Sequence, residues 1–265
     1  MPELPEVETI KRDLLKKVLN KEIIEVKINL SRSLENPQNL SICGKIKDIK
    51  RLGKYLILHT PNSILLIHLR MTGKLIYHPI SSGFDEKHVR VIFYFKEGDC
   101  LLFNDVRTFG KIEVLPAQTS IKELKKLGID ALSNEFDLKT FSDICKAKRK
   151  PIKTLLLDQN LIAGIGNIYA MEILFAAKVS PLRISATLNN DELSRIHKHS
   201  FEILNLAIKH NGTSISDFRR VDDKTGEFQN FLKVYGKKKC PVCDAELTKI
   251  KQGGRSTTFC EHCQT

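Results

Sequence analysis

The spacing of apolar residues predicts one helix at the start of the chain, followed by a long β-rich segment. Residues 3–19 carry apolar side chains at steps of three and four, the period of a helix with one buried face. These side chains are Val7, Ile10, Leu14, Leu15 and Val18. From residue 22 to about 113, short β-rich segments are broken by Gly, Pro, Asn or Asp. The clearest are 54–60, 64–69, 89–95 and 100–104. Several short strands in succession predict a sandwich or a barrel-like domain.

The pattern becomes helical from about residue 136. Helices are predicted at 138–148, 152–157, 168–177 and 190–210, and Asn211-Gly212 closes the last of them as a C-cap. The final 30 residues predict short strands around cysteines. A β-rich half followed by a helical half predicts an α+β protein.

The size and the charge of the chain limit the classes of function that it can have. A chain of 265 residues suggests two modest domains. The formal net charge is +12 and the sequence pI is about 9.3, a balance that attracts polyanions such as DNA or RNA. On charge alone, a basic housekeeping protein without a nucleic-acid role stays equally open.

The location follows from what the sequence lacks. It has no run of 18 apolar residues, and acids stand at positions 3, 6 and 8, where a signal peptide carries bases. We therefore expect no membrane association and a cytosolic location, where thiols stay reduced. Of the seven cysteines, Cys43, Cys100 and Cys145 are expected to be ordinary buried thiols.

The other four cysteines form a metal-binding pattern. Cys240, Cys243, Cys260 and Cys263 have the spacing C-x2-C-x16-C-x2-C, in which two knuckles complete a tetrahedron of thiolates. Two redox pairs are the weaker alternative. Four protein ligands leave no open position, so one structural zinc is predicted. Between the knuckles, a hairpin with Arg255 near its tip suits a DNA backbone, and a solvated basic turn is the alternative.

The start of the chain carries candidate catalytic groups. Pro2 directly follows the initiator methionine, whose removal uncovers a secondary amine able to form an iminium. Glu3 and Glu6 supply carboxylates that can move protons beside it.

Three further turns carry candidate DNA contacts. Residues 158–170 join two helices through Gly164 and Gly166 beside a basic cluster at 146–153, which indicates either a phosphate site or a packing turn. Lys54 begins a strand, where a lysine can reach a phosphate or assist proton transfer, although such lysines are usually just exposed. Apolar and guanidinium side chains at the turns 69–73 and 103–110 are suited to replacing an extruded base.

With these residues assembled, the chain closely resembles the bacterial formamidopyrimidine-DNA glycosylase family, repair enzymes that remove 8-oxoguanine and ring-opened purines. The resemblance covers essentially the whole length. Its motifs are PELPEVET at 2–9, LGKYL at 52–56, HLRMTG at 68–73, KH at 87–88, the loop of Arg107 and Phe109, GIGNIYA at 164–170, FLKVYG at 231–236 and GGR at 253–255.

The resemblance implies a role for each matching residue. Pro2 is the nucleophile at the sugar C1′, Glu3 the acid that helps to open the sugar, and Glu6 a supporting acid. Lys54 is implied in β-elimination and Arg255 in δ-elimination. DNA contacts are implied for the remaining positions, which are His88, Arg107, Lys148, Lys153 and Asn167, with Met71, Arg107 and Phe109 filling the void left by the flipped base.

The resemblance also implies the architecture and the setting. Residues 1–115 are expected to form the catalytic helix and a β-sandwich, 116–135 a linker, 136–230 a helix–two-turn–helix DNA-binding domain, and 231–265 a zinc-finger β-hairpin. The implied enzyme acts as a monomer on damaged double-stranded DNA, in a bacterial cytoplasm and near the nucleoid, as a base excision repair glycosylase and AP lyase.

Two departures from the family pattern bear on base preference. Arg90 stands where the family usually has a second histidine, and Lys237–Lys239 is a shortened segment. The loop 216–227 is expected to fold over the damaged base. The alternatives are an endonuclease VIII-type enzyme for oxidised pyrimidines, a non-catalytic lesion-binding protein and, more remotely, an N-terminal-proline tautomerase. Leu4 and the set of Met71, Arg107 and Phe109 favour an enzyme for oxidised purines.

Overall fold

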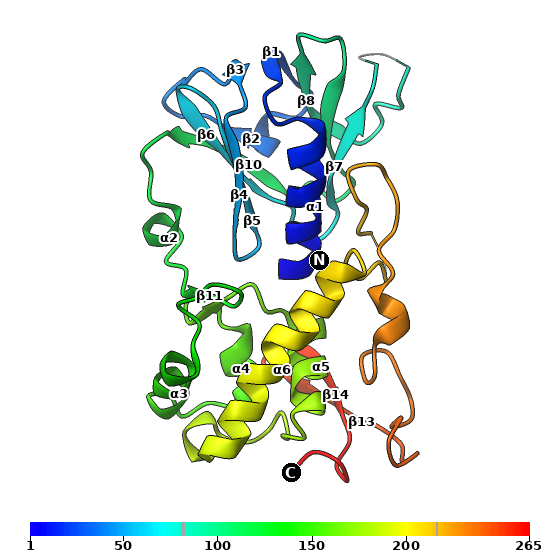
Figure 1. Ribbon diagram of the computed structural model, residues 1–265. Helices are drawn as coiled ribbons and strands as arrows, with labels where there is room; N and C mark the ends of the chain where they lie inside the picture. The colour runs from blue at the N-terminus through cyan, green and yellow to red at the C-terminus, as the bar shows by residue number, and fades with distance from the viewer. Residues whose placement is uncertain (81–82, 216) are drawn as a thin grey trace. The chain divides into compact units, whose positions relative to one another are not determined.

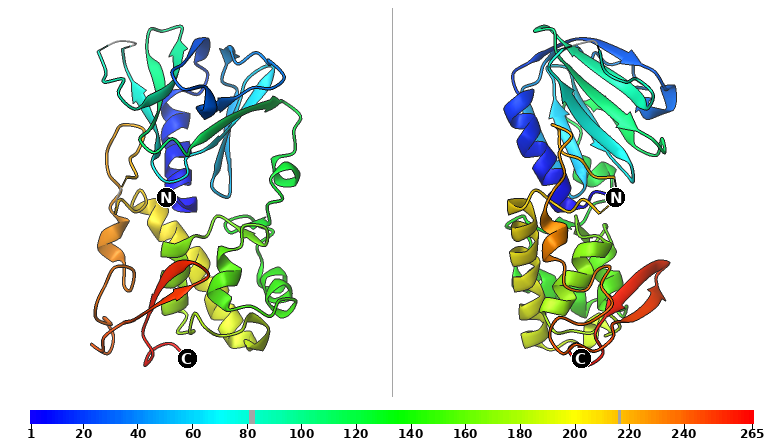
Figure 2. Two further views of the ribbon diagram at one scale, coloured as in Figure 1. Left: turned by 180° about the vertical axis from the view of Figure 1, so that it is seen from behind. Right: turned by 90° about the vertical axis from the view of Figure 1, so that its right-hand side faces the viewer.

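Two five-stranded sheets form a β-sandwich in the first half of the chain (Figure 1; Figure 2). The computed structural model describes residues 1–80, 83–215 and 217–265. One sheet has the order β3-β1-β8-β9-β7 and the other β2-β10-β6-β5-β4. The strands are β1 (Glu22–Ile28), β2 (Leu34–Glu35), β3 (Gly44–Lys45), β4 (Asp48–Leu52), β5 (Tyr55–His59), β6 (Ser63–His68), β7 (Gly73–His78), β8 (Val89–Phe95), β9 (Cys100–Asp105) and β10 (Lys111–Pro116). The predicted α+β class with an amino-terminal sandwich is confirmed.

Helix α1 (Leu4–Lys17) shares the core of the sandwich. Its apolar stripe, including Ile10 and Leu14, is fully buried against side chains of both sheets, such as Leu65 and Phe103. Burial of the apolar side chains of α1 and of the two sheets is the main favourable contribution to the stability of the sandwich. Helix α2 (Ile121–Leu124) adds Ile121 to a smaller cluster on β5 and β6.

By its internal contacts the chain divides into two units. The amino-terminal unit comprises Met1–Leu124 and Ile208–Gln229, and the zinc unit comprises Lys125–Ala207 and Asn230–Thr265. The sequence places residues 208–229 in the helical domain, whereas in the structure they join the amino-terminal unit. Phe218 and Val221 enter the sandwich core, and Val221 O accepts a hydrogen bond from Tyr77 N at 2.9 Å.

An ion pair also fastens this segment. The Arg220 guanidinium donates from Nε and Nη2 to the two carboxylate oxygens of Asp13 on α1, at 3.0 and 2.8 Å. A paired fork of this kind fixes the direction of both side chains.

The zinc unit is built from helices, a short parallel strand pair and one hairpin. Its elements are β11 (Ile129–Asp130), α3 (Leu138–Lys146), α4 (Ile152–Leu157), β12 (Ile162–Ala163), α5 (Asn167–Ala176), most of α6 (Asn190–Lys209), β13 (Thr248–Gln252) and β14 (Arg255–Phe259). The hairpin turns at Gly253 and Gly254, both with positive φ, as a two-residue turn requires. No helix in the described ranges is long and apolar enough to cross a membrane.

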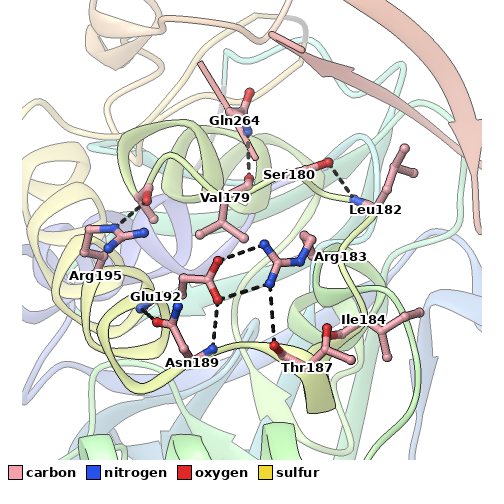
Figure 3. Close-up of polar contacts among 11 residues, drawn as sticks. Val179, Ser180, Leu182, Arg183, Ile184, Thr187, Asn189, Glu192, Arg195 and Gln264 are labelled. Atoms are coloured by element: carbon pink, nitrogen blue, oxygen red, sulfur yellow. Dashed lines mark hydrogen bonds and ion pairs between the residues drawn. The ribbon is translucent and has the colours of Figure 1, made fainter. Parts of the chain in front are cut away.

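The connection before α6 is fixed by a fork of charges (Figure 3). Arg183 donates to both oxygens of Glu192 at 2.8 and 3.2 Å. Glu192 also accepts from Asn189 N, while Asn189 Oδ1 accepts from Glu192 N, which is the reciprocal capping of a helix start. Gln264 donates to Val179 O at 3.0 Å and so ties the end of the chain to the same connection.

Phe103 lies at the centre of the sandwich and is fully buried, whereas Phe109 is 53% exposed. We expect Phe103→Ala to lower the free energy of unfolding by about 3–5 kcal/mol, because it leaves a cavity. The matched variant Phe109→Ala should change it by about 0.5 kcal/mol or less. Denaturant titration followed by circular dichroism measures both. Equal effects of the two variants would contradict this core assignment.

Candidate active site and nucleic-acid interface

The start of α1 is organised by one carboxylate. Glu6 Oε2 accepts from the backbone N–H of Glu3 at 2.8 Å, and Glu6 Oε1 accepts from Thr213 N at 2.7 Å. Glu3 and Glu6 are buried, and so is Pro2. Both oxygens of Glu6 therefore hold backbone N–H groups, one in the residue next to Pro2 and one in the segment after α6.

A glycine is required where the chain passes Glu6. Gly212 has a φ of 78°, and a Cβ added to it would lie 2.9 Å from the Glu6 side chain. Asn211, with a φ of 59°, precedes it, so the predicted Asn-Gly ending of α6 is present.

Lys54 lies in the two-residue turn between β4 and β5. Leu52 pairs with Tyr55, and Gly53 has a φ of 56°, as the first position of such a turn requires. Arg51 donates to Gly53 O and to Glu8 Oε2 on α1, both at 3.0 Å. Although a strand-end lysine is usually exposed, Lys54 is buried, and Arg51 ties its turn to α1.

Arg51 and Glu8 did not stand out in the sequence, and the only signal was an acid in the PELPEVET motif. Burial disfavours ionisation of Glu8, but hydrogen bonds from Lys11 and Arg51 outweigh it and lower its pKa. Glu8 is thus a charged, paired group inside the amino-terminal unit.

Met71, Arg107 and Phe109 come from two turns at the same end of one sheet, since Gly73 of β7 pairs with Asp105 of β9. Met71 is 42% exposed and Phe109 53%. The guanidinium of Arg107 lies over the Phe109 ring, 5.1 Å from its centre. The structure therefore brings the three predicted side chains to the same end of one sheet, where all three are exposed.

The buried carboxylate of Asp105 joins these two turns. Its Oδ2 accepts from Gly110 N at 2.7 Å, and its Oδ1 accepts from Arg107 N at 3.2 Å and from the Thr72 hydroxyl. Thr72 lies next to Met71 and also accepts from Arg107 N, at 3.1 Å. The sequence did not single out Asp105, although an aspartate just before a turn is typical of side-chain-capped turns.

His88 precedes β8 and is half-buried, and its carbonyl accepts from Asp105 N at 2.9 Å. The loop expected to cover the damaged base begins at Ser216, which lies outside the described residues. Five features with predicted roles therefore belong to the amino-terminal unit: the start of α1, the Lys54 turn, the two outward turns and His88.

In the zinc unit, two predicted phosphate ligands hold the hairpin. Lys153 is fully buried, and its Nζ donates to Ser256 O at 3.0 Å and to the Thr257 hydroxyl at 2.6 Å. Asn167, the first residue of α5, donates to the same Ser256 O at 3.1 Å. They fix the strand next to Arg255, which is exposed, as is Lys148. Lys153 was expected to contact a DNA phosphate directly, whereas in the structure its side chain is fully buried beneath the hairpin.

The Gly-rich turn before α5 is packed inside the unit. Gly164 and Gly166 are buried, and Gln159 bridges the turn by accepting from Gly164 N at 3.0 Å and donating to Ile165 O at 2.8 Å. Of the two readings of this segment, the two glycines fit a packing turn rather than a phosphate site. The start of α5 that follows them is partly exposed.

The four predicted metal ligands cluster. The Sγ atoms of Cys240, Cys243, Cys260 and Cys263 all lie within 4.8 Å of one another. Cys240 and Cys263 are 3.8 Å apart and Cys243 and Cys260 3.5 Å, close to the value of about 3.8 Å for a tetrahedron of Zn–S bonds. The residues fit one structural zinc. Of the other three thiols, Cys100 and Cys145 are buried as expected, but Cys43 is exposed, so that expectation was wrong. Cys43 lies in the connection just before β3, where the chain runs over the surface.

A buried acid on α5 holds the segment that leads into the zinc module. Glu172 accepts from the backbone N–H groups of Lys233, Val234 and Tyr235 at 2.8–3.0 Å. Burial raises the pKa of Glu172, although these three N–H groups act in the opposite direction. Glu172 lies within an apolar helix, and no motif or spacing in the sequence singled it out.

Comparisons with known proteins agree with this geometry. The chain matches the formamidopyrimidine-DNA glycosylase N-terminal domain over residues 1–112, the H2TH domain of the same glycosylase over 127–219, and a zinc finger found in FPG and IleRS over 237–265. It is 42% identical to the formamidopyrimidine-DNA glycosylase of Mycoplasma genitalium, covering 100% of this chain and 96% of that protein. The Streptococcus pneumoniae glycosylase is 39% identical, with 100% and 99% covered.

Solved structures are similar over the same length. A complex of a Lactococcus lactis FPG mutant with Fapy-dG containing DNA has a TM-score of 0.91 at 37% identity, covering 99% of each chain. The Lactococcus lactis Fpg complex with abasic-site DNA has a TM-score of 0.88 at 36% identity, with the same coverage. These matches place the chain among the DNA glycosylases that carry a zinc finger. It belongs to the formamidopyrimidine-DNA glycosylase family.

The cysteine geometry predicts about one zinc ion per chain. Cys260→Ser should lose that zinc and should weaken amide exchange protection in the zinc unit before it affects the sandwich. Cys43→Ser, which removes an exposed thiol, should keep the metal. Mass spectrometry of the native protein and hydrogen exchange measure the two effects. Full zinc content in Cys260→Ser would contradict the assignment.

Glu8 predicts a pH-dependent contribution to stability. Because its pKa is lowered from 4.5 on folding, its contribution is present above about pH 4.5 and is lost as the pH falls through the lower folded value. Glu8→Gln should therefore destabilise the protein by about 1–3 kcal/mol at neutral pH and by less in acid. Glu25→Gln, at an exposed position, is the control. A Glu8→Gln effect that is the same at both pH values would exclude this linkage.

Proposed function

We propose that this protein is a bifunctional DNA glycosylase and AP lyase of base excision repair, which removes oxidised purines such as 8-oxoguanine and formamidopyrimidines. The observation that carries the proposal is the buried start of α1, where Pro2 and Glu3 are buried and Glu6 holds the N–H of Glu3, the residue next to Pro2. A lesion-binding protein without catalysis has no need of this arrangement. The family membership and the full-length similarity to formamidopyrimidine-DNA glycosylases support it.

Removal of Met1 gives Pro2 a secondary amine, a fraction of which is neutral near pH 7–8 because ordinary α-amino groups have pKa values of about 7.7–8.0. Its nitrogen forms a bond to the sugar C1′ as the bond from C1′ to the base breaks. Glu3 gives a proton to the ring oxygen and the Pro2 nitrogen releases its own proton, so the sugar opens and an iminium links C1′ to Pro2. The departing base takes up a proton and leaves.

The iminium acidifies the proton on C2′. Loss of that proton expels the 3′ phosphate (β-elimination), and loss of a further proton from the sugar chain expels the 5′ phosphate (δ-elimination). Water then hydrolyses the iminium and frees Pro2. Lys54 is proposed to move protons in the first elimination and Arg255 to stabilise phosphate in the second.

The outward turns supply the means to hold damaged duplex DNA open. Met71, Arg107 and Phe109 are proposed to fill the gap left by the extruded nucleotide, with Arg107 facing the unpaired cytosine. Backbone phosphates are assigned to His88, Lys148 and the start of α5 at Asn167.

Lys153 is proposed to act on the DNA backbone through the hairpin that it braces, next to Arg255. We further propose that the enzyme acts as a monomer in the bacterial cytoplasm, close to the nucleoid, where its net charge of +12 favours association with DNA.

One observation favours a second substrate class. A Lactococcus lactis Fpg has been solved with DNA that contains an oxidized pyrimidine, and this chain is similar to it with a TM-score of 0.89 at 36% identity. Oxidised pyrimidines are therefore the alternative substrates to compare with purines.

Borohydride trapping tests the proposal. The full-length protein is incubated with one duplex that carries 8-oxoguanine opposite cytosine and with another that carries dihydrouracil, and the iminium is reduced to a stable adduct. We expect an adduct mainly on the purine lesion. Pro2→Gly should trap far less, whereas Pro37→Gly, at an exposed proline of the same unit, should trap like the wild type.

Each other result has a definite meaning. Trapping only on dihydrouracil would assign the protein to oxidised pyrimidines. An absence of trapping on both duplexes, with DNA binding retained, would leave a non-catalytic lesion binder. Full activity of a protein that keeps Met1 would exclude the Pro2 amine as the nucleophile.

A further inference from the structure

Arg90 lies at a β-bulge. Between β8 and β9, Val89 pairs with Asn104 and Val91 with Phe103, so Arg90 is the extra residue of its strand. Its carbonyl accepts from Asn29 N at 2.9 Å and from Leu30 N at 3.2 Å, which holds the bulge in place. A bulge re-aims the side chain of the inserted residue, and here that side chain is a guanidinium.

The guanidinium of Arg90 has two partners. Its Nε donates to Asp105 O at 2.7 Å, and its Nη2 lies 3.3 Å from His88 Nδ1. Arginine has only donors, so a hydrogen bond between these atoms requires His88 Nδ1 to be without a proton. The single ring proton of neutral His88 is then on Nε2.

A carboxylate could have competed for this imidazole. The nearest acid in the sequence is Glu86, whose oxygens accept from Lys27 Nζ at 3.0 and 3.3 Å and from Asn29 Nδ2 at 3.3 Å. Glu86 is thus engaged on β1 and its following residue. Because Glu86 is engaged there, we take Arg90 as the partner of His88 Nδ1.

We propose that Arg90 is a positioning residue that holds His88 as the Nε2–H tautomer, a directed donor to a DNA phosphate. The inference rests on the proposed function, which assigns His88 to the DNA backbone. A histidine in place of Arg90 could donate or accept, and so would leave the tautomer of His88 open.

The tautomer can be measured directly. Long-range nitrogen–proton NMR of the zinc-loaded full chain, at a pH of about 8 where histidine is ordinarily neutral, separates protonated from unprotonated ring nitrogens. His88→Gln assigns the signal. We expect Nδ1 unprotonated and Nε2 protonated in the wild type, and a mixture of tautomers in Arg90→Met.

Two controls keep the result interpretable. Lys96→Met removes a positive charge just beyond the other end of β8 and should leave the His88 signals unchanged. Arg90→Lys keeps the charge but loses the fork that reaches two acceptors, so it should also give a mixture if Arg90→Met fails to fold. A wild-type Nδ1–H tautomer, or an unchanged tautomer in both Arg90 variants, would overturn the proposal.

DNA affinity supplies the functional measurement. On a duplex with an uncleavable tetrahydrofuran site, Arg90→Met and His88→Gln should each weaken binding about three- to tenfold, the size of one hydrogen bond. The double variant should lose little more than either single one, because both remove one coupled contact. Additive losses would overturn the coupling.

The two levels of the proposal fail separately. If His88→Gln binds the duplex like the wild type, the phosphate role of His88 is wrong, while the NMR still decides whether Arg90 sets its tautomer. Borohydride trapping by these variants then reports whether the Pro2 chemistry is independent of both.

Discussion

The carboxylate of Glu6 is the contact on which the amino-terminal unit depends. One oxygen holds the N–H of Glu3 and the other the N–H of Thr213, so the residue beside Pro2 and the segment 208–229 share one anchor. A carboxylate near the start of a helix is also favoured by the helix dipole. Gly212 lacks a side chain because Glu6 fills that space. An amide at position 6 could accept only one of the two bonds, and a shorter acid would not reach both.

The same device recurs wherever a loop must be rigid. Asp105 fixes the turns of Met71 and Arg107, Glu172 holds three consecutive N–H groups before the zinc module, and Glu192 caps α6 while pairing with Arg183. Loops offer little apolar surface to bury, so buried carboxylates satisfied by backbone N–H groups replace a core there. These acids are buried, whereas cations such as Lys148 and Arg255 are exposed.

Periodicity and motifs predicted the parts whose causes are local. The strand at 89–95 and the helix at 152–157 agree with β8 and α4 residue for residue, because apolar spacing decides both. The cysteine cluster followed from spacing alone. Contacts between distant residues were not predictable: the entry of 208–229 into the sandwich unit, the burial of Lys153 and the exposure of Cys43 depend on which segments meet in the fold. The bulge at Arg90 arises from a shift in register between β8 and β9, and the sequence of one strand does not reveal how it pairs with another.

The hairpin shows why a structural metal matters for chemistry. Arg255 begins β14, whose far end leads into Cys260 of the zinc cluster. Its near end is held at Ser256 O by Lys153 and Asn167, residues that lie about one hundred positions earlier in the chain. Zinc alone would leave the tip free to bend, and the buried lysine alone would leave the base of the hairpin unfastened. With both ends fixed, the backbone that carries Arg255 is rigid, and a rigid backbone would lower the entropy lost in the phosphate contact proposed for Arg255. On the proposed function, loss of zinc is therefore expected to weaken the contact of this hairpin with DNA.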